Sequence, residues 1–193
     1  MNKATLVVSL FLAICLSGCS SAPPKRVASI DQFQAIYTSY NIWVERPEVI
    51  HSVNYKKGGI LPAGSQVVDY KMGEHRRSKT VTLTTLQPAR NFKIFWDQRN
   101  HPGQTFEQFL QELLVGEDFS AQVKGLRDSE VQAIKRGEVS PGMSKKAVLV
   151  SYGPPSAKET FARAGKFWVY PMHRFRKIKM EFDSKGKVVN SGS

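Results

Sequence analysis

The strongest constraint on this chain lies in its N-terminal segment, which combines one positive charge, a short apolar run and small residues. Lys3 is followed by a 13-residue, mainly apolar run from Ala4 to Leu16. As a helix this run would extend about 20 Å, whereas the hydrocarbon core of a bilayer is about 30 Å thick. The pattern is therefore typical of a secretory signal, and we expect residues 1–18 to be a signal peptide that is removed.

The residues that end this leader indicate what happens to the exported chain. Leu16-Ser17-Gly18-Cys19 resembles the lipobox of bacterial lipoproteins. This resemblance implies cleavage before Cys19, acylation of Cys19 and, because Ser20 rather than Asp follows, transport to the outer membrane. Two or more acyl chains would hold the protein there almost permanently. We expect a lipid-anchored, periplasm-facing protein; the alternative is a secreted protein in which the cysteine occurs by chance.

The same segment excludes a disulfide. The chain has two cysteines, of which Cys15 lies in the leader and Cys19 would carry lipid. The mature chain must then hold its fold by packing alone, although the periplasm permits disulfides. About 170 residues are enough for one good core or two small ones.

The charge balance is strongly basic, with 28 Lys and Arg residues against 16 Asp and Glu residues, a formal charge of +12. An exported protein rarely meets nucleic acid, and we predict no nucleic-acid partner. This charge favours binding to a negatively charged partner: anionic phospholipid, lipopolysaccharide, peptidoglycan or an acidic envelope protein.

The first half of the mature chain has the composition of a β-rich domain. Residues 19–29 are polar and contain two prolines, which predicts a tether. Residues 30–100 are rich in β-branched and aromatic residues with regularly spaced turn residues, which favours a small SH3-like domain. The predicted strands are Ala35 to Val44, His51 to Tyr55, Gln66 to Tyr70, Thr80 to Leu86 and Phe92 to Phe95, with breaks at 57–59, 61–64, 73–75 and 87–88.

Residues 101–127 change character and predict a helical connector. Phe106, Phe109, Leu110, Leu113 and Leu114 have the spacing i, i+3, i+4, i+7 and i+8 of an apolar helix stripe. The predicted helix runs from Thr105 to Val115, and Gly116 ends it.

Residues 128–193 predict a second α+β domain. A short helix begins at Asp128 or Ser129 and ends at Gly137, and Ser144 can cap a second helix from Lys145 to Tyr152. Gly153, followed by two prolines, ends that helix. Three strands follow, at Lys166 to Tyr170, Arg176 to Phe182 and Val188 to Val189. The fold class predicted for the whole chain is α+β, with the C-terminal helices packed on a three-stranded antiparallel sheet.

This last region resembles the SmpA/OmlA (BamE-like) domain over roughly residues 129–189. The residues that carry the resemblance are Gly142-Met143-Ser144-Lys145-Lys146-Ala147-Val148, Tyr152-Gly153-Pro154-Pro155, Trp168-Val169-Tyr170, Ile178-Lys179-Met180-Glu181-Phe182-Asp183 and Gly186-Lys187-Val188. The resemblance implies an outer-membrane lipoprotein that supports the insertion of β-barrel proteins. The long β-rich region before the domain is a departure from that family.

Basic residues form the main candidate contact with an anionic surface. In the strand from Arg176 to Phe182, alternation places Lys177 and Lys179 on the face opposite Ile178, and Arg174 and Arg176 extend that cationic face. The functional interpretation is a strip that meets lipid headgroups or an acidic partner; the alternative is an ordinary solvated sheet face.

Two aromatic residues form the second candidate. Trp168 and Tyr170 alternate with Val169 and therefore point to one side of the sheet. They suit core packing or an aromatic patch that contacts a partner.

Catalytic and metal-binding patterns are missing from the sequence. The four histidines are scattered without a metal-ligand spacing, and no Gly-x-Ser-x-Gly motif is present. Paired carboxylates brought together by the fold remain an open alternative. We predict no enzyme, no metal and no cofactor.

The sequence therefore predicts a protein that acts by binding, as an accessory or scaffold for envelope proteins and in that role a contributor to outer-membrane protein assembly. The alternative is a module that binds peptidoglycan or lipopolysaccharide through its SH3-like half, and an enzyme comes third.

Overall fold

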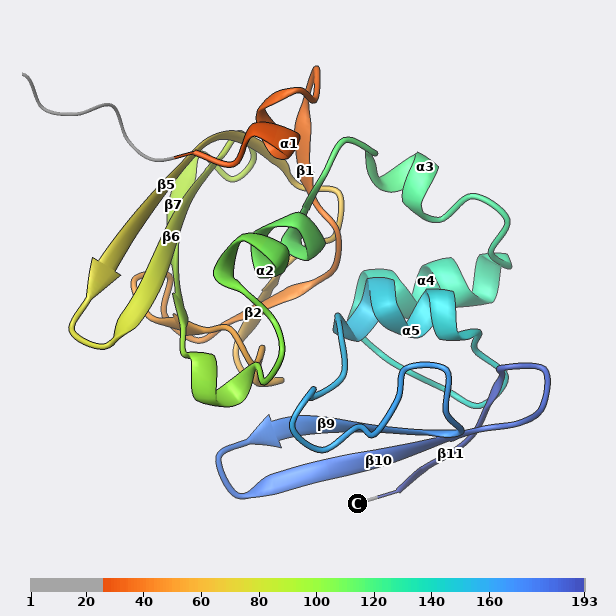
Figure 1. Ribbon diagram of the computed structural model, residues 1–193. Helices are drawn as coiled ribbons and strands as arrows, with labels where there is room; N and C mark the ends of the chain where they lie inside the picture. Colours follow the sequence, from red (N-terminus) through yellow and green to blue (C-terminus); the bar gives the residue numbers. More distant parts are fainter. Residues whose placement is uncertain (1–25, 193) are drawn as a thin grey trace, which may run out of the picture.

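A computed structural model of the chain describes residues 26–192, and these form a mixed α and β structure with one large curled sheet and one three-stranded sheet (Figure 1). The helices are α1 (Ala28–Asp31), α2 (Phe106–Leu113), α3 (Phe119–Gln122), α4 (Asp128–Arg136) and α5 (Lys145–Tyr152), with a 3-10 turn at Gln98–Asn100. The predicted signal peptide, Cys19 and residues 19–25 of the tether lie outside the described residues.

The strands of the first half are β1 (Ile36–Thr38), β2 (Ile42–Val44), β3 (Ile50–His51), β4 (Gly59–Leu61), β5 (Gln66–His75), β6 (Ser78–Thr85), β7 (Arg90–Trp96) and β8 (Leu114–Val115). Six of them form a sheet in the order β3-β7-β6-β5-β1-β8, and β2 and β4 form a separate ribbon. All neighbours in the large sheet are antiparallel except β3 and β7. Figure 1 shows this sheet curling around α2.

The helix α2 completes the core of this sheet. Its four buried apolar residues, Phe106, Phe109, Leu110 and Leu113, belong to the same cluster as Tyr70 and the strand residues opposite them. The side chain of Thr105 caps the helix, and Gln108 returns a hydrogen bond to the Thr105 backbone, a capping box.

Two predictions for this region need correction. The helix was expected to reach Val115, but Leu114 is already extended and pairs with Thr38 as part of β8. Residues 101–127 were expected to be a connector, whereas α2 and β8 belong to the first core and sheet. We therefore call residues 26–115 the N-terminal unit and residues 119–192 the C-terminal unit.

The predicted strands of residues 30–100 are present in part. The expected strand from Ala35 to Val44 is divided into β1 and β2 by a bend at Ser39 and Tyr40. The expected strand from His51 to Tyr55 is wrong beyond His51, since Asn54 has a left-handed backbone with φ 53°. The break expected at 73–75 is wrong as well, because β5 continues to His75.

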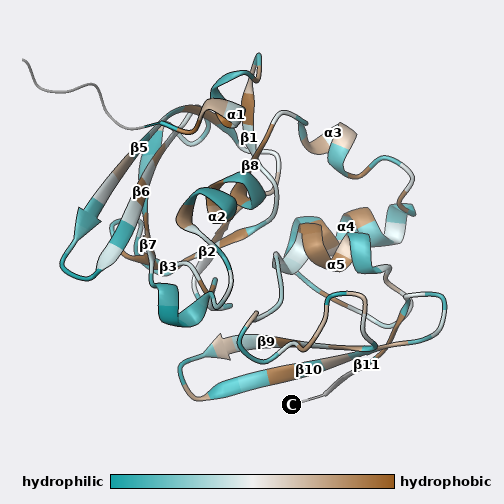
Figure 2. Cartoon of the chain, in the orientation of Figure 1, coloured by the Kyte–Doolittle hydropathy of each residue, from teal (hydrophilic) through white to brown (hydrophobic). Residues whose placement is uncertain are grey.

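The C-terminal unit has the predicted order of elements. Helices α4 and α5 lie side by side against β9 (Phe167–His173), β10 (Arg176–Phe182) and β11 (Val188–Gly192), which form an antiparallel sheet in the order β11-β10-β9 (Figure 1). The predicted start and end of α5 are confirmed, with the Ser144 side chain accepting a hydrogen bond from Ala147 and Gly153 at the C-cap. Figure 2 shows hydrophobic positions on α2, α4 and α5 and hydrophilic positions where β10 begins.

Polar contacts join the two units. Asn41 accepts a hydrogen bond from Ala63 N at its Oδ1 (2.8 Å) and donates from its Nδ2 to Ile134 O (2.7 Å). Its backbone N also donates to Val150 O at 3.0 Å. Asn41 is only 1 % exposed, so this residue is a buried bridge between the β2 region and the α4–α5 pair.

Candidate functional site

The turn between β9 and β10 exposes a large aromatic side chain between two arginines. His173 and Arg176 form the last pair of the two strands, and Arg174 and Phe175 lie in the turn between them. Phe175 is 84 % exposed, and the guanidinium of Arg174 lies 5.4 Å from the centre of its ring. The Phe175 backbone N donates to His173 Nδ1 (3.2 Å), which ties the turn to β9. We call residues 173–176 the hairpin tip.

A groove of about 770 Å³ lies between the hairpin tip and the N-terminal unit. Its charged side chains are four cations, Lys56, Lys57, Arg174 and Arg176, and one carboxylate, Glu45. Lys57 Nζ lies 2.6 Å from Glu45 Oε1, and this hydrogen bond lowers the pKa of Glu45. The groove therefore has an excess of positive charge, which favours an anionic ligand.

Lys56 lines this groove, but its ammonium group already has partners within the protein. Its Nζ donates to Asn54 O and Tyr152 O, each at 2.7 Å, and lies over the rings of Tyr152 and Tyr170 at 5.1 and 5.6 Å. Burial lowers the pKa of Lys56 well below its ordinary value. The lysine therefore holds the 54–56 turn against α5.

The predicted cations of the strand face have partners within the protein. Lys177 Nζ forms an ion pair with Glu159 Oε1 at 2.6 Å, and Lys179 Nζ lies 3.8 Å from the ring centre of Phe167. In the described part of the chain, residues 26–192, neither Arg174 nor Arg176 has an ion pair. Of the four predicted cations, Lys177 is thus the one with an ion pair among the described residues, while Lys179 and Arg174 each lie against an aromatic ring.

The predicted aromatic residues lie in the core. Trp168 and Tyr170 are 1 % and 0 % exposed, Trp168 Nε1 donates to Arg163 O (2.9 Å), and the Tyr170 hydroxyl donates to Gly153 O (3.0 Å). Burial raises the pKa of Tyr170 well above its ordinary value. Of the two interpretations of the Trp-x-Tyr strand, core packing is the one that describes these side chains, and the exposed aromatic patch is not present.

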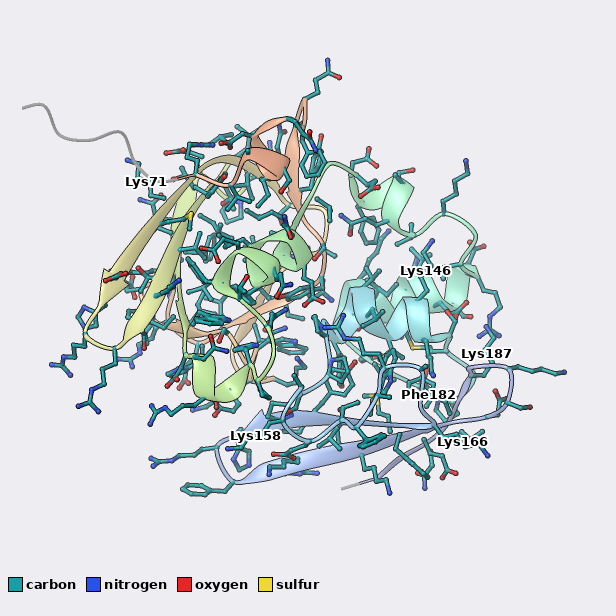
Figure 3. The ribbon with its side chains drawn as sticks, in the orientation of Figure 1. Lys71, Lys146, Lys158, Lys166, Phe182 and Lys187 are labelled. Atoms are coloured by element: carbon teal, nitrogen blue, oxygen red, sulfur yellow. The ribbon has the colours of Figure 1, made fainter. Side chains whose placement is uncertain are left out.

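Other basic residues lie at the opposite end of the same sheet. Figure 3 labels Lys166 and Lys187 at the end of the C-terminal sheet away from the hairpin tip. Lys187 Nζ lies 3.8 Å from Glu130 Oε1. Positive charge is therefore present at both ends of the sheet, and the more exposed aromatic ring lies at the hairpin tip, since Phe175 is 84 % exposed and Phe167, beside Lys166, is 43 % exposed.

Sequence reasoning missed two parts of this site. It named the cations of residues 174–179 but not Phe175, although an aromatic residue between two arginines in a turn is a visible signal. It also missed Lys57 and Tyr55, which the fold brings to the groove from a segment more than 100 residues earlier. No local pattern connects these two segments.

No family model, curated protein or solved structure matches this chain. Within the described residues, no helix is long and apolar enough to cross a membrane. That part of the chain also contains no group of three or more His, Cys, Asp or Glu side chains arranged to hold a metal ion.

Proposed function

We propose that this protein is an outer-membrane lipoprotein, anchored by acylated Cys19, that acts as an accessory or scaffold for envelope proteins and contacts an anionic surface with its hairpin tip. The observation that carries this proposal is the exposed Phe175 between Arg174 and Arg176, two cations that have no ion pair within residues 26–192. The resemblance of residues 129–189 to the SmpA/OmlA domain supports a role in outer-membrane protein assembly.

The chemistry of the hairpin tip suits a lipid headgroup region. An aromatic ring favours the boundary between headgroups and acyl chains, and each cation near an anionic surface contributes about 1 kcal/mol. Arg174 and Arg176 can bind phosphate oxygens with two parallel hydrogen bonds each, which a lysine cannot do. Lys177 already has the carboxylate of Glu159 as a partner and contributes less.

The proposal is tested by binding to vesicles. The full chain with Cys19→Ser, which carries no lipid, is mixed with vesicles of phosphatidylglycerol and phosphatidylethanolamine. We expect Arg174→Ser with Arg176→Ser to reduce partitioning about tenfold or more at low salt, and Phe175→Ala to reduce it further. The matched control is Lys177→Ser with Lys179→Ser, which removes the same formal charge from the strand face, where Glu159 already neutralises Lys177, and should have a smaller effect. Equal losses in the two double variants would contradict the proposal.

The anchor has its own test. Cells that express the wild-type chain should incorporate labelled palmitate into it, and Cys19→Ser should abolish the label. If the wild-type chain takes up no palmitate, the lipoprotein part of the proposal fails while the vesicle result stands independently.

The alternative function is a module that binds peptidoglycan or lipopolysaccharide, with an SH3-like N-terminal unit as the binding part. The cationic groove between Lys57 and the hairpin tip favours it, since lipid A phosphates carry the same charge as phospholipid headgroups. Pull-down of the acylated protein from its own envelope separates the two functions. Enrichment of β-barrel assembly components supports the scaffold role, and co-sedimentation with purified peptidoglycan supports the alternative.

A further inference from the structure

A second cavity, lined by residues of both units, shares no lining residue with the groove at the hairpin tip. This cleft has a volume of about 490 Å³, within the range of small-molecule sites. Its walls come from the turn after β3, the loop before α2, one face of α2 and residues 154–163 of the C-terminal unit. Apolar side chains, among them Tyr40, Val53 and Phe109, line it together with a small number of polar groups.

The cleft contains a serine hydrogen-bonded to a histidine. Ser52 Oγ lies 2.7 Å from His101 Nε2, although the two residues are 49 positions apart in the sequence. The His101 ring is stacked on Trp96 with an interplanar angle of 20° and contacts Phe109 at 5.5 Å between ring centres. These two aromatic contacts fix the plane of the imidazole with Nε2 directed at Ser52.

The neighbours of His101 determine which of its nitrogens carries the proton. Arg163 pairs with Glu112 Oε1 at 2.6 Å, and Gln104 Nε2 donates to Glu112 Oε2 at 2.7 Å. A carboxylate only accepts hydrogen bonds, so the Gln104 amide must present its NH₂ group to Glu112 and its oxygen to His101. Gln104 also forms a side-chain hydrogen bond with His101, so the imidazole is the donor to the Gln104 oxygen, and the lone pair of Nε2 is left to accept the hydroxyl proton of Ser52.

The surroundings also keep the histidine uncharged. Burial lowers the pKa of His101, while Gln104 and the negative charges of Glu112 and Asp97 act in the opposite direction. A neutral imidazole with its Nε2 lone pair on a serine hydroxyl is the arrangement of a general base and its nucleophile. The Gln104 amide and Glu112 take the place that a carboxylate has in a catalytic triad.

We propose that Ser52 and His101 form a nucleophile and general-base pair and that the cleft accepts a neutral carboxylic ester. The ester is neutral because the one cation of the cleft wall that could attract an acid, Arg163, is already paired with Glu112. The apolar walls suit the acyl part of such a substrate.

The reaction divides into two steps. Ser52 Oγ attacks the ester carbonyl and forms a new C–O bond while its proton moves to His101 Nε2, and the protonated imidazole then gives this proton to the departing alcohol. Water, activated by the same nitrogen, attacks the acyl-serine and releases the carboxylic acid and free Ser52. Gln104 is a positioning residue, because it acts only through His101.

The test is covalent labelling with a fluorophosphonate, which reacts with an activated serine, followed by mass spectrometry of the full chain carrying Cys19→Ser. We expect one adduct on Ser52, no adduct in Ser52→Ala, and labelling at least 100-fold slower in His101→Ala. The matched control is Ser184→Ala, which removes an exposed hydroxyl in the turn between β10 and β11, does not line the cleft and should leave labelling unchanged.

Two further measurements separate a catalytic pair from a structural hydrogen bond. Hydrolysis of p-nitrophenyl butyrate should follow labelling across the variants. In Gln104→Ala, NMR spectra of the imidazole nitrogens should show a smaller fraction of the His101 tautomer protonated at Nδ1 than in the wild-type chain. Labelling of Ser52 should also be slower in this variant. A folded wild-type chain without an adduct on Ser52, or His101→Ala labelled at the wild-type rate, would overturn the proposal, and neither result bears on the hairpin tip.

Discussion

The two units of the molecule are stabilised in different ways. In the N-terminal unit the sheet is completed by pairings between distant segments, such as Tyr37 with Val115 across β1 and β8 and Ile50 with Ile94 across β3 and β7. In the C-terminal unit the strands β9, β10 and β11 pair in chain order, and α4 and α5 are neighbours in sequence. The first unit depends on closing long loops, the second on short connections.

The comparison extends to buried charge. The N-terminal core contains Thr and Asn but no buried carboxylate among the described residues, whereas the C-terminal unit buries Glu130, which is 2 % exposed. Its Oε1 accepts from Ser144 N at 2.6 Å, and its Oε2 accepts from Arg127 N and Nε, each at 3.1 Å. One side chain thus ties the start of α4 to the start of α5.

The largest effect should come from Glu130→Gln. Burial tends to raise the pKa of Glu130, but hydrogen bonds from Ser144 and Arg127 outweigh it and lower the pKa from 4.5 to about 2. That difference corresponds to about 3 kcal/mol of folding free energy at neutral pH. Urea unfolding should show this loss, while Glu138→Gln, which removes an exposed ion pair with Arg136, should cost less than about 1 kcal/mol. Similar losses in both variants would mean that burial does not set Glu130 apart from an exposed carboxylate.

The contribution of Glu130 to the stability of the C-terminal unit should depend on pH. Because the folded pKa of Glu130 is depressed, its contribution is fully present above pH 4.5 and is lost as the pH falls toward 2. We expect the wild-type free energy of unfolding to decrease over this window more steeply than that of Glu130→Gln. Parallel curves for the two proteins would mean that another group governs acid unfolding.

The difference between the units also explains how much of the fold the sequence predicts. In the C-terminal unit the signals are local: Ser144 caps α5, Gly153 ends it, and the turn at 183–187 separates β10 from β11, so the predicted order of elements is confirmed. In the N-terminal unit, Leu114 belongs to an apolar helix stripe but pairs with Thr38 as a strand, because a distant edge of the sheet needs a partner. Such a pairing leaves no pattern in neighbouring residues.

The candidate site follows the same rule. Arg174, Arg176, Lys177 and Lys179 were found because alternation along one strand is a local signal. Which of them has an ion pair or a ring contact depends on Glu159 and Phe167, whose positions only the fold determines. The Ser52–His101 pair was missed for this reason too, since its two members are 49 residues apart in the sequence.

The next largest effect should come from Asn41, the buried residue that links the β2 region to α4 and α5. Asn41→Ala removes a buried amide and leaves Ala63 N and Ile134 O without their side-chain partner, which should cost about 2 kcal/mol. If the hydrogen bonds of Asn41 couple the unfolding of the two units, tryptophan fluorescence and far-UV circular dichroism should no longer give coincident unfolding curves in Asn41→Ala. Asn91→Ala, which removes an exposed hydrogen bond to Thr84, is the control and should change stability by less than about 0.5 kcal/mol.

The smallest effects compare the two helix caps directly. Thr105→Ala removes the cap of α2 in the N-terminal unit, and Ser144→Ala removes the cap of α5 in the C-terminal unit. Each should cost about 1 kcal/mol, because each frees one backbone N–H at a helix start.

The folding kinetics of the two cap variants should differ. If local contacts form first, Ser144→Ala slows folding of its unit, whereas Thr105→Ala mainly speeds unfolding. Stopped-flow chevrons measure both rates, and slower folding in Thr105→Ala would show that α2 forms before the long-range strand pairs that surround it.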